Sequence, residues 1–210
     1  MVNRSAEFAS LLCSRLCHDL LSPVGALNNG IELLADETDP EMRERCMELL
    51  AESARATANR LKFFRLAFGA AGGFGELVGA REALAAIEGL HGTDGKVRVG
   101  WMVEAEALPK TAMKVLLNLA LIAGDALVRG GRLDIGADGA EVVIRAEGPR
   151  LILDPELRNA LLGEADPDMI SPRAAAAWLV HILVDEQGGS VQLSQPEDGV
   201  LMIGTTLPSR

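Results

Sequence analysis

The stretch Leu12-Cys-Ser-Arg-Leu-Cys-His18-Asp-Leu-Leu-Ser-Pro23 decides how the first third of this 210-residue chain folds. Around it, apolar side chains recur at steps of three, four or seven residues: Phe8, Leu12, Leu16, Leu20, Leu27, Ile31 and Leu34. This spacing is typical of one face of an α-helix and predicts a helix from about residue 5 to residue 36. Pro23 removes one backbone donor, but the stripe resumes in phase after it, so we expect a kink there rather than an end.

A second helix is predicted after a short turn. Asp39 is suited to cap its N-terminus, with Pro40 at the first helical position, and the helix should run to about Phe68. Its expected buried side consists of Met42, Cys46, Leu50, Ala54, Leu61, Phe64 and Phe68. Two antiparallel helices leave half of each apolar stripe uncovered, and such hairpins usually pair into a four-helix bundle. We therefore predict a homodimer.

The second part of the chain has a different pattern. Residues 69–79 contain five glycines and are predicted to form a linker. Beyond them, strands are predicted near 97–103, 132–137, 141–146, 191–193 and 200–207, and helices near 109–128 and 171–187. Helices mixed with hairpin-linked strands predict an α/β sandwich. We expect two domains, a helical hairpin over residues 1–70 and the sandwich over 76–210.

Composition excludes several classes of function. The chain has 20 Lys and Arg against 30 Asp and Glu, a net charge of -10, and no basic block to neutralise nucleic-acid phosphates. With 3% aromatics and no Tyr it also lacks base-stacking side chains. The longest apolar run, residues 174–184, is far shorter than the roughly 20 residues that span a bilayer, and the N-terminus does not resemble a secretory signal. We expect a cytoplasmic protein with no nucleic-acid or membrane partner.

The cysteines and two of the three histidines predict no chemistry. Cys13, Cys17 and Cys46 match no standard zinc spacing and are expected to be small, reduced core residues. His91 is expected in a glycine-rich loop and His181 in the last helix, both as structural or surface residues.

His18 differs from the other two histidines in its predicted position. On a helical wheel it lies almost opposite the apolar stripe, so its side chain should face solvent. Asp19 can hydrogen-bond one ring nitrogen, fix the tautomer and leave the other nitrogen nucleophilic. Position alone does not distinguish such a nucleophile from an ordinary surface histidine. The same outer face contains the candidate partner-binding residues Leu11, Ser14, Arg15, Leu21, Ser22, Gly25 and Asn29.

The run His18-Asp-Leu-Leu-Ser-Pro23 resembles the phosphoacceptor box of sensor histidine kinases, whose helical hairpin precedes an ATP-binding α/β sandwich. Compared with the kinase boxes, Asn118 matches the first asparagine of the asparagine box. Ile122 replaces the magnesium-binding asparagine, Ala146 the adenine-reading aspartate, and the alanines at 174–177 the second glycine box. Ile122 has no oxygen to ligate Mg²⁺, and Ala146 accepts no side-chain hydrogen bond. The resemblance thus implies a histidine-kinase-like sandwich that has lost ATP binding.

This combination resembles the ChpT family of histidine phosphotransferases, in residues 12–20, 28–33, 118–125 and 171–178. The resemblance implies that His18 carries a phosphoryl group from the receiver domain of a hybrid histidine kinase to response regulators, including CtrA-type cell-cycle regulators. Asp19 would orient the imidazole, and Arg15 would pair with an acidic receiver loop or steady the phosphoryl group. No cofactor is implied, because the Mg²⁺ belongs to the receiver.

The sequence is also compatible with two other functions: an active ATP-dependent histidine kinase, and a non-catalytic scaffold or inhibitor of a two-component kinase. The use of the sandwich is also open. It would either add docking surface for the receiver or only stabilise the fold.

Overall fold

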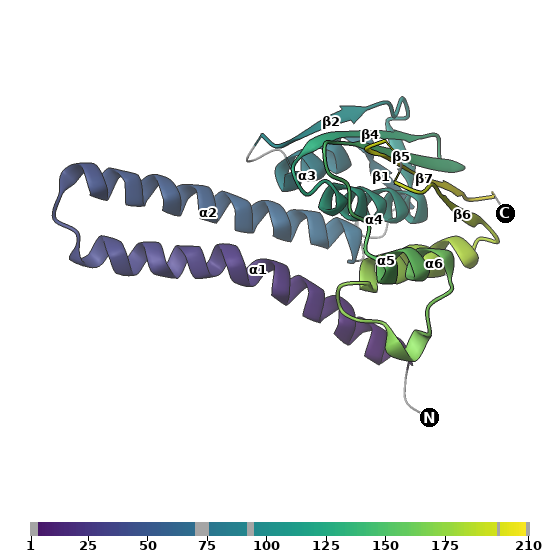
Figure 1. Cartoon of the computed structure of the whole chain (residues 1–210), viewed down its shortest axis with the longest axis horizontal. Coiled ribbons are helices and arrows are strands. Elements are labelled where there is room, and N and C mark those ends of the chain that lie inside the picture. The colour runs from purple at the N-terminus through teal and green to yellow at the C-terminus, as the bar shows by residue number, and fades with distance from the viewer. Residues whose placement is uncertain (1–3, 70–75, 92–94, 197, 209–210) are drawn as a thin grey trace.

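The computed structural model describes residues 4–69, 76–91, 95–196 and 198–208. Two long antiparallel helices, α1 (Arg4–Asp36) and α2 (Pro40–Ala67), project from an α/β body (Figure 1). The Asp39 side chain accepts a hydrogen bond from the backbone N–H of Glu41, and Pro40 occupies the first helical position, as predicted. Helix α1 continues through Pro23, so this proline does not end it.

The body is built on a five-stranded sheet in the order β2-β4-β5-β7-β6. Its strands are β2 (Val97–Trp101), β4 (Gly131–Ala137), β5 (Glu141–Glu147), β6 (Ser190–Leu193) and β7 (Val200–Thr206). Only the β2–β4 pair is parallel among these neighbours. Side chains on β5 and β7 alternate between buried and more exposed positions, because helices cover one face of the sheet and solvent the other.

The covering layer contains α3 (Ala80–His91), α4 (Lys110–Ala126) and α6 (Ala175–Asp185), with α5 (Pro155–Leu162) beside α6. A 3₁₀ turn, Pro167–Met169, leads toward α6. Two short strands, β1 (Leu77–Gly79) and β3 (Ala107–Pro109), pair antiparallel outside the main sheet. This mixed sheet with helices on one side confirms the predicted α/β architecture.

The end of α2 belongs to the core of the body. Phe63, Phe64, Leu66 and Ala67 are buried in the same hydrophobic cluster as α4 and the inner face of the sheet. In addition, the buried Asn118 on α4 donates through Nδ2 to the carbonyl oxygen of Ala67, over 3.1 Å. The hairpin is therefore packed onto the sandwich as well as joined to it by the chain.

Several local predictions are wrong. The linker predicted over 69–79 includes Leu77–Gly79, which form β1, while residues 70–75 lie outside the described part of the chain. His91 ends α3 instead of lying in a loop, and α3, α5, β1 and β3 were not predicted. The last helix begins at Ala175, after a turn at 172–174, and not at Ser171.

The surface of the hairpin also differs from the prediction. Cys13 and Cys17 are exposed and only Cys46 is buried, so the expectation of three core cysteines is wrong for two of them. Four residues of the predicted buried stripes, Ile31, Met42, Ala54 and Leu61, are exposed in the single chain. Among the described residues, no helix is both long enough and apolar enough to cross a membrane.

Candidate functional site

His18 lies on the exposed side of α1, as predicted. Its side chain is 84% exposed, and Nδ1 lies 3.0 Å from Oδ1 of Asp19, whose side chain is only 17% exposed. An ionised carboxylate accepts hydrogen bonds and does not donate them, so this contact favours the tautomer with the proton on Nδ1. Nε2 makes no hydrogen bond to any described residue, and its lone pair is then available to an incoming electrophile.

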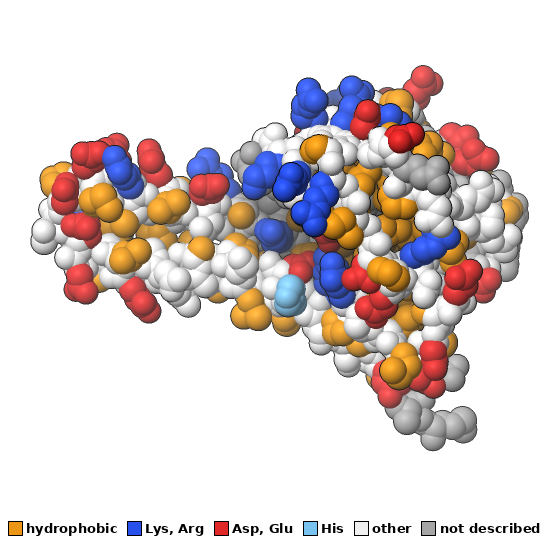
Figure 2. Space-filling view, viewed as in Figure 1, with side chains coloured by type: hydrophobic (Ala, Val, Ile, Leu, Met, Phe, Trp, Pro, Cys, Tyr) orange, Lys and Arg blue, Asp and Glu red, His pale blue; other side chains and the backbone are white. Residues whose placement is uncertain are grey.

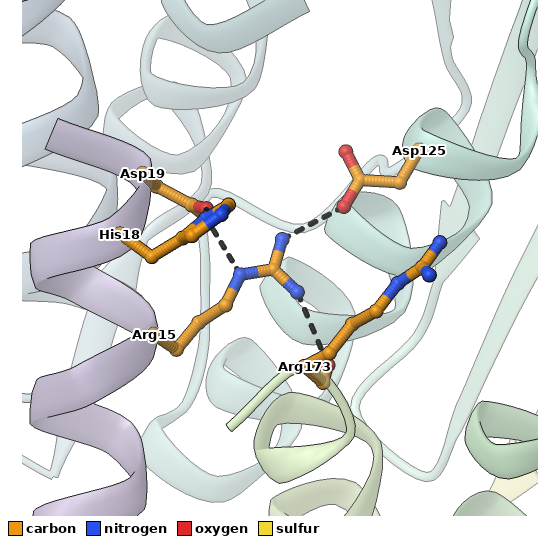
Figure 3. A network of polar contacts seen from close by, with 5 residues as sticks. All are labelled: Arg15, His18, Asp19, Asp125 and Arg173. Atoms are coloured by element: carbon orange, nitrogen blue, oxygen red, sulfur yellow. Dashed lines mark hydrogen bonds and ion pairs between the residues drawn. The ribbon is translucent and has the colours of Figure 1, made fainter. Parts of the chain in front are cut away.

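Arg15 lies one turn before Asp19 and, unlike the prediction, is buried, with a side chain 10% exposed. Its Nε donates to Oδ2 of Asp19 over 2.7 Å and its Nη2 to Oδ2 of Asp125 over 2.8 Å. Its Nη1 donates to the carbonyl oxygen of Arg173 over 3.1 Å. Figure 3 shows the guanidinium between α1 and the sandwich, with a partner on each side. Arg15 is thus an internal bridge and not part of an open docking face.

The electrostatics of this bridge are balanced by ion pairing. Burial disfavours the charged guanidinium, but the carboxylates of Asp125 and Asp19 outweigh burial and raise the pKa of Arg15 above its ordinary value. Asp125 is the penultimate residue of α4, where the helix dipole disfavours a negative charge. The ion pair with Arg15 offsets this cost, so each of the three groups depends on the others.

A cleft of about 860 Å³ lies beside His18, between the hairpin and the sandwich. Figure 2 shows Lys and Arg side chains gathered where these two parts meet. The cleft is lined by Ser14, Arg15, His18, Asp19, Ser22, Arg60, Leu90, Leu121, Asp125, Ser171, Pro172 and Arg173. The side chain of Arg173 pairs with Asp154 over 3.1 Å, whereas Arg60 forms no hydrogen bond or ion pair with any described residue.

The other predicted partner-binding residues do not form one surface. Ser14 and Ser22 are exposed and line the cleft with His18, and Leu21 is 69% exposed on α1. No atom of the described residues lies within 4 Å of a Cβ added at Gly25, so this position has room for a partner's side chain. Asn29 instead borders a separate hollow with Glu32, Leu33, Asp36 and Glu37. Leu11 is half-buried and packs against the hydrophobic core, so its prediction as an exposed anchor is wrong.

Sequence reasoning missed Arg60, Asp125 and Arg173 as members of the site. Asp125 and Arg173 were nevertheless inside the runs 118–125 and 171–178 that resemble the phosphotransferase family. Their role depends on contacts with Arg15, which the sequence does not reveal because Asp125 is 110 residues and Arg173 is 158 residues from Arg15 along the chain. Arg60 had no sequence signal, because an arginine on an amphipathic helix is ordinarily solvated.

The residues that correspond to kinase nucleotide boxes lie in the core. Asn118 is fully buried, with Nδ2 bonded to the carbonyl oxygens of Ala67 and Lys114. Ala146 is fully buried in β5, and the alanines at 174–177 are buried at the start of α6. Among the described residues, no three His, Cys, Asp or Glu side chains converge as a metal site would require.

Comparison with known proteins agrees with this geometry. Residues 80–199 match the family model of the histidine phosphotransferase C-terminal domain. The chain is 34% identical over 200 residues to protein phosphotransferase ChpT of Brucella abortus (strain 2308), with 93% of each chain covered.

A solved 1.7 Å structure of a bacterial phosphotransferase superposes with a TM-score of 0.84 at 30% identity, covering 98% of both chains. A histidine kinase domain from the Erythrobacter litoralis EL346 blue-light activated kinase gives a TM-score of 0.46 at 13% identity, covering 98% of this chain and 94% of the kinase. The chain therefore belongs to the ChpT family, and it is a histidine phosphotransferase of two-component phosphorelays.

Proposed function

We propose that His18 is the phosphoryl carrier of this phosphotransferase. The observation that supports it is an exposed imidazole whose Nδ1 is bonded to Asp19, which leaves Nε2 free. In the forward step the Nε2 lone pair attacks phosphorus of a receiver's aspartyl phosphate. The P–O bond to the aspartyl oxygen breaks, and its electron pair returns to the receiver's carboxylate. The phosphorylated ring keeps its proton on Nδ1, and Asp19 stabilises the resulting positive charge.

The second step, transfer from His18 to another receiver, uses the same nitrogen and phosphorus atoms in reverse. A carboxylate oxygen of a second receiver attacks phosphorus, the Nε2–P bond breaks, and its electron pair returns to the ring. Phosphoryl transfer depends mainly on positioning and charge neutralisation. The Mg²⁺ that neutralises the phosphoryl oxygens belongs to the receiver, so the chain supplies the nucleophile and its orientation. CtrA-type cell-cycle regulators are our proposed acceptors, and the receiver of a hybrid kinase is the proposed donor.

We further propose that the sandwich no longer binds ATP. Asn118 and Ala146 are fully buried, and the segment that would form a phosphate-covering lid starts a packed helix. Opening a nucleotide site here would require exposing the core. This favours a phosphocarrier over an ATP-dependent kinase, and the free Nε2 of His18 favours it over a non-catalytic scaffold.

The receiver is proposed to dock over His18 and the cleft. Ser14 and Ser22 lie on the helix face around His18, and Leu21 offers an exposed apolar contact. Arg60 on α2 also lines the cleft and provides a positive charge with no partner among the described residues, suited to the acidic active site of a receiver. Because Ser171, Pro172 and Arg173 of the sandwich line the same cleft, both domains would then contact the same receiver.

The central test is transfer without ATP. A receiver domain carrying labelled aspartyl phosphate is mixed with the chain, and the label is followed to the chain and mapped by peptide digestion. We expect rapid, acid-labile labelling of the peptide that contains His18, and no labelling from ATP alone. Label that reaches the chain only when ATP is present would contradict the proposal and favour a kinase.

A homodimer formed through the hairpin is also proposed. Apart from Leu21 beside His18, the apolar residues exposed on it are Val24, Ile31 and Leu33 on α1, and Met42, Met47, Leu49 and Leu61 on α2. Many exposed apolar side chains on a two-helix hairpin favour an interface with a second copy of the hairpin. We expect sedimentation at twice the 22.2 kDa chain mass, and Ile31→Glu to shift the protein to monomer. Val143→Glu, which changes an exposed apolar residue on the solvent-facing side of β5, is the control and should stay dimeric. A monomeric wild-type protein at micromolar concentration would exclude the dimer.

A further inference from the structure

Asp19 is held by two neighbours, one on each carboxylate oxygen. Oδ2 accepts from Nε of Arg15 over 2.7 Å, and Oδ1 lies 3.0 Å from Nδ1 of His18. Because the two oxygens belong to one planar group, fixing Oδ2 also fixes the direction in which Oδ1 points. The orientation of the carboxylate that faces His18 is therefore set by the position of the Arg15 guanidinium.

Arg15 is in turn positioned by the sandwich. Its two Nη atoms bond to Asp125, at the end of α4, and to the carbonyl oxygen of Arg173, just before α6. A guanidinium is rigid and planar, so these two bonds and the bond to Asp19 define one geometry. A single chain of contacts thus runs from the sandwich through Arg15 and Asp19 to the imidazole (Figure 3).

His18 has little else to orient it. With a side chain 84% exposed, it is not packed by neighbours, and Asp19 is its one hydrogen-bond partner among the described residues. In water a neutral imidazole carries its proton mainly on Nε2, which would block the nitrogen proposed to attack. An oriented acceptor at Nδ1 reverses this preference.

We propose that Arg15 and Asp125 are positioning residues: they let the sandwich hold Asp19 in the orientation that keeps the His18 proton on Nδ1 and presents Nε2. The inference rests on the proposed function of His18. It gives the sandwich a use that needs no nucleotide, and it is a use within the same chain, because all four residues belong to one protomer.

The charges around His18 fit this role. Together the side chains of Asp19, Arg15 and Asp125 carry a net charge of -1. The positive charge of Arg15 therefore cancels part of the repulsion that Asp19 would exert on an incoming phosphoryl group. The remaining charged groups at the cleft are Arg60 on α2 and Arg173 before α6, the latter paired with Asp154. Arg15 thus allows a carboxylate to orient the nucleophile at a reduced electrostatic cost.

The test compares Asp125→Ala and Asp125→Asn with Asp185→Asn in the full-length protein. Asp185 is an exposed residue on α6 whose side chain forms no hydrogen bond or ion pair with any described residue, and its substitution removes the same charge from the sandwich. Nitrogen-15 chemical shifts of His18, assigned by difference from His18→Gln, give the ratio of the two tautomers. Phosphoramidate, a small phosphoryl donor, then phosphorylates the ring without a receiver, and NMR distinguishes the Nε2 from the Nδ1 product.

We expect Asp125→Ala to raise the Nε2–H tautomer fraction and to slow Nε2 phosphorylation by about tenfold, the scale of a modest misalignment of reacting groups. Asp125→Asn, which keeps an oxygen acceptor for Arg15, should lie between Asp125→Ala and wild type, and Asp185→Asn should equal wild type. An unchanged tautomer ratio in Asp125→Ala would overturn the inference, even with a lower rate. The tautomer measurement needs no phosphoryl donor, so failure of His18 to accept phosphate would contradict the proposed function separately.

Discussion

The variant His18→Gln is expected to lose at least about 10³-fold in phosphoryl acceptance from a phosphorylated receiver. Glutamine has a similar reach and its amide N–H still offers Asp19 a hydrogen bond. Its nitrogen lone pair is delocalised into the carbonyl group, however, so it is not a nucleophile. Acceptance is measured as the rate at which labelled phosphate moves from the receiver to the chain.

This loss should occur without loss of the fold. The His18 side chain is 84% exposed, and its one hydrogen bond to a described residue is with Asp19, so the free energy of unfolding should change by less than about 0.5 kcal/mol. His181→Gln is the matched control, because it removes a histidine that stacks on Trp178 away from the cleft. We expect it to keep phosphoryl acceptance. If His18→Gln still accepts phosphate at the wild-type rate, another group is the carrier.

The long helices could be predicted from sequence because their signals are local. The apolar spacing around His18 and the cap at Asp39 depend only on residues within a few turns, and α1 and α2 end within about a residue of the prediction. The outward position of His18 follows from the same wheel. Short elements such as β1 and β3 were missed, since three residues are too few for a period and their pairing joins positions 30 apart.

The surroundings of His18 could not be predicted in the same way. The helical-wheel prediction allowed the first helix only one buried face. On that basis Leu11 and Arg15 were placed on the outer side with His18. In the structure the N-terminal half of α1 is also covered by the sandwich, so Arg15 meets Asp125 and the Arg173 carbonyl. These contacts depend on how the domains pack. The prediction for Cys13 and Cys17 is wrong for another reason: it rested on residue type, and both are exposed in the structure.

The second large effect is expected for Arg15→Met, as a loss of stability. Methionine fills a similar volume but leaves Asp19 and Asp125 without their shared cation. Removing one partner of a buried ion pair costs about 3–5 kcal/mol, and the half-exposed Asp125 places this case near the lower value. For a chain of this size, about 3 kcal/mol lowers the melting temperature by roughly 10 °C, which calorimetry or circular dichroism measures.

Two further variants distinguish a lost ion pair from lost packing. Arg81→Met removes an exposed arginine from α3 and should change the free energy of unfolding by less than about 0.5 kcal/mol. Adding Asp125→Asn to Arg15→Met removes one of the two carboxylates that have lost their cationic partner. The double variant should therefore be more stable than Arg15→Met alone. If it is less stable, the cost of Arg15→Met comes from packing and the carboxylates are not held by charge. Recovery would instead mean that Arg15 stabilises the junction chiefly by keeping two acids, one from each part of the molecule, close together beside His18.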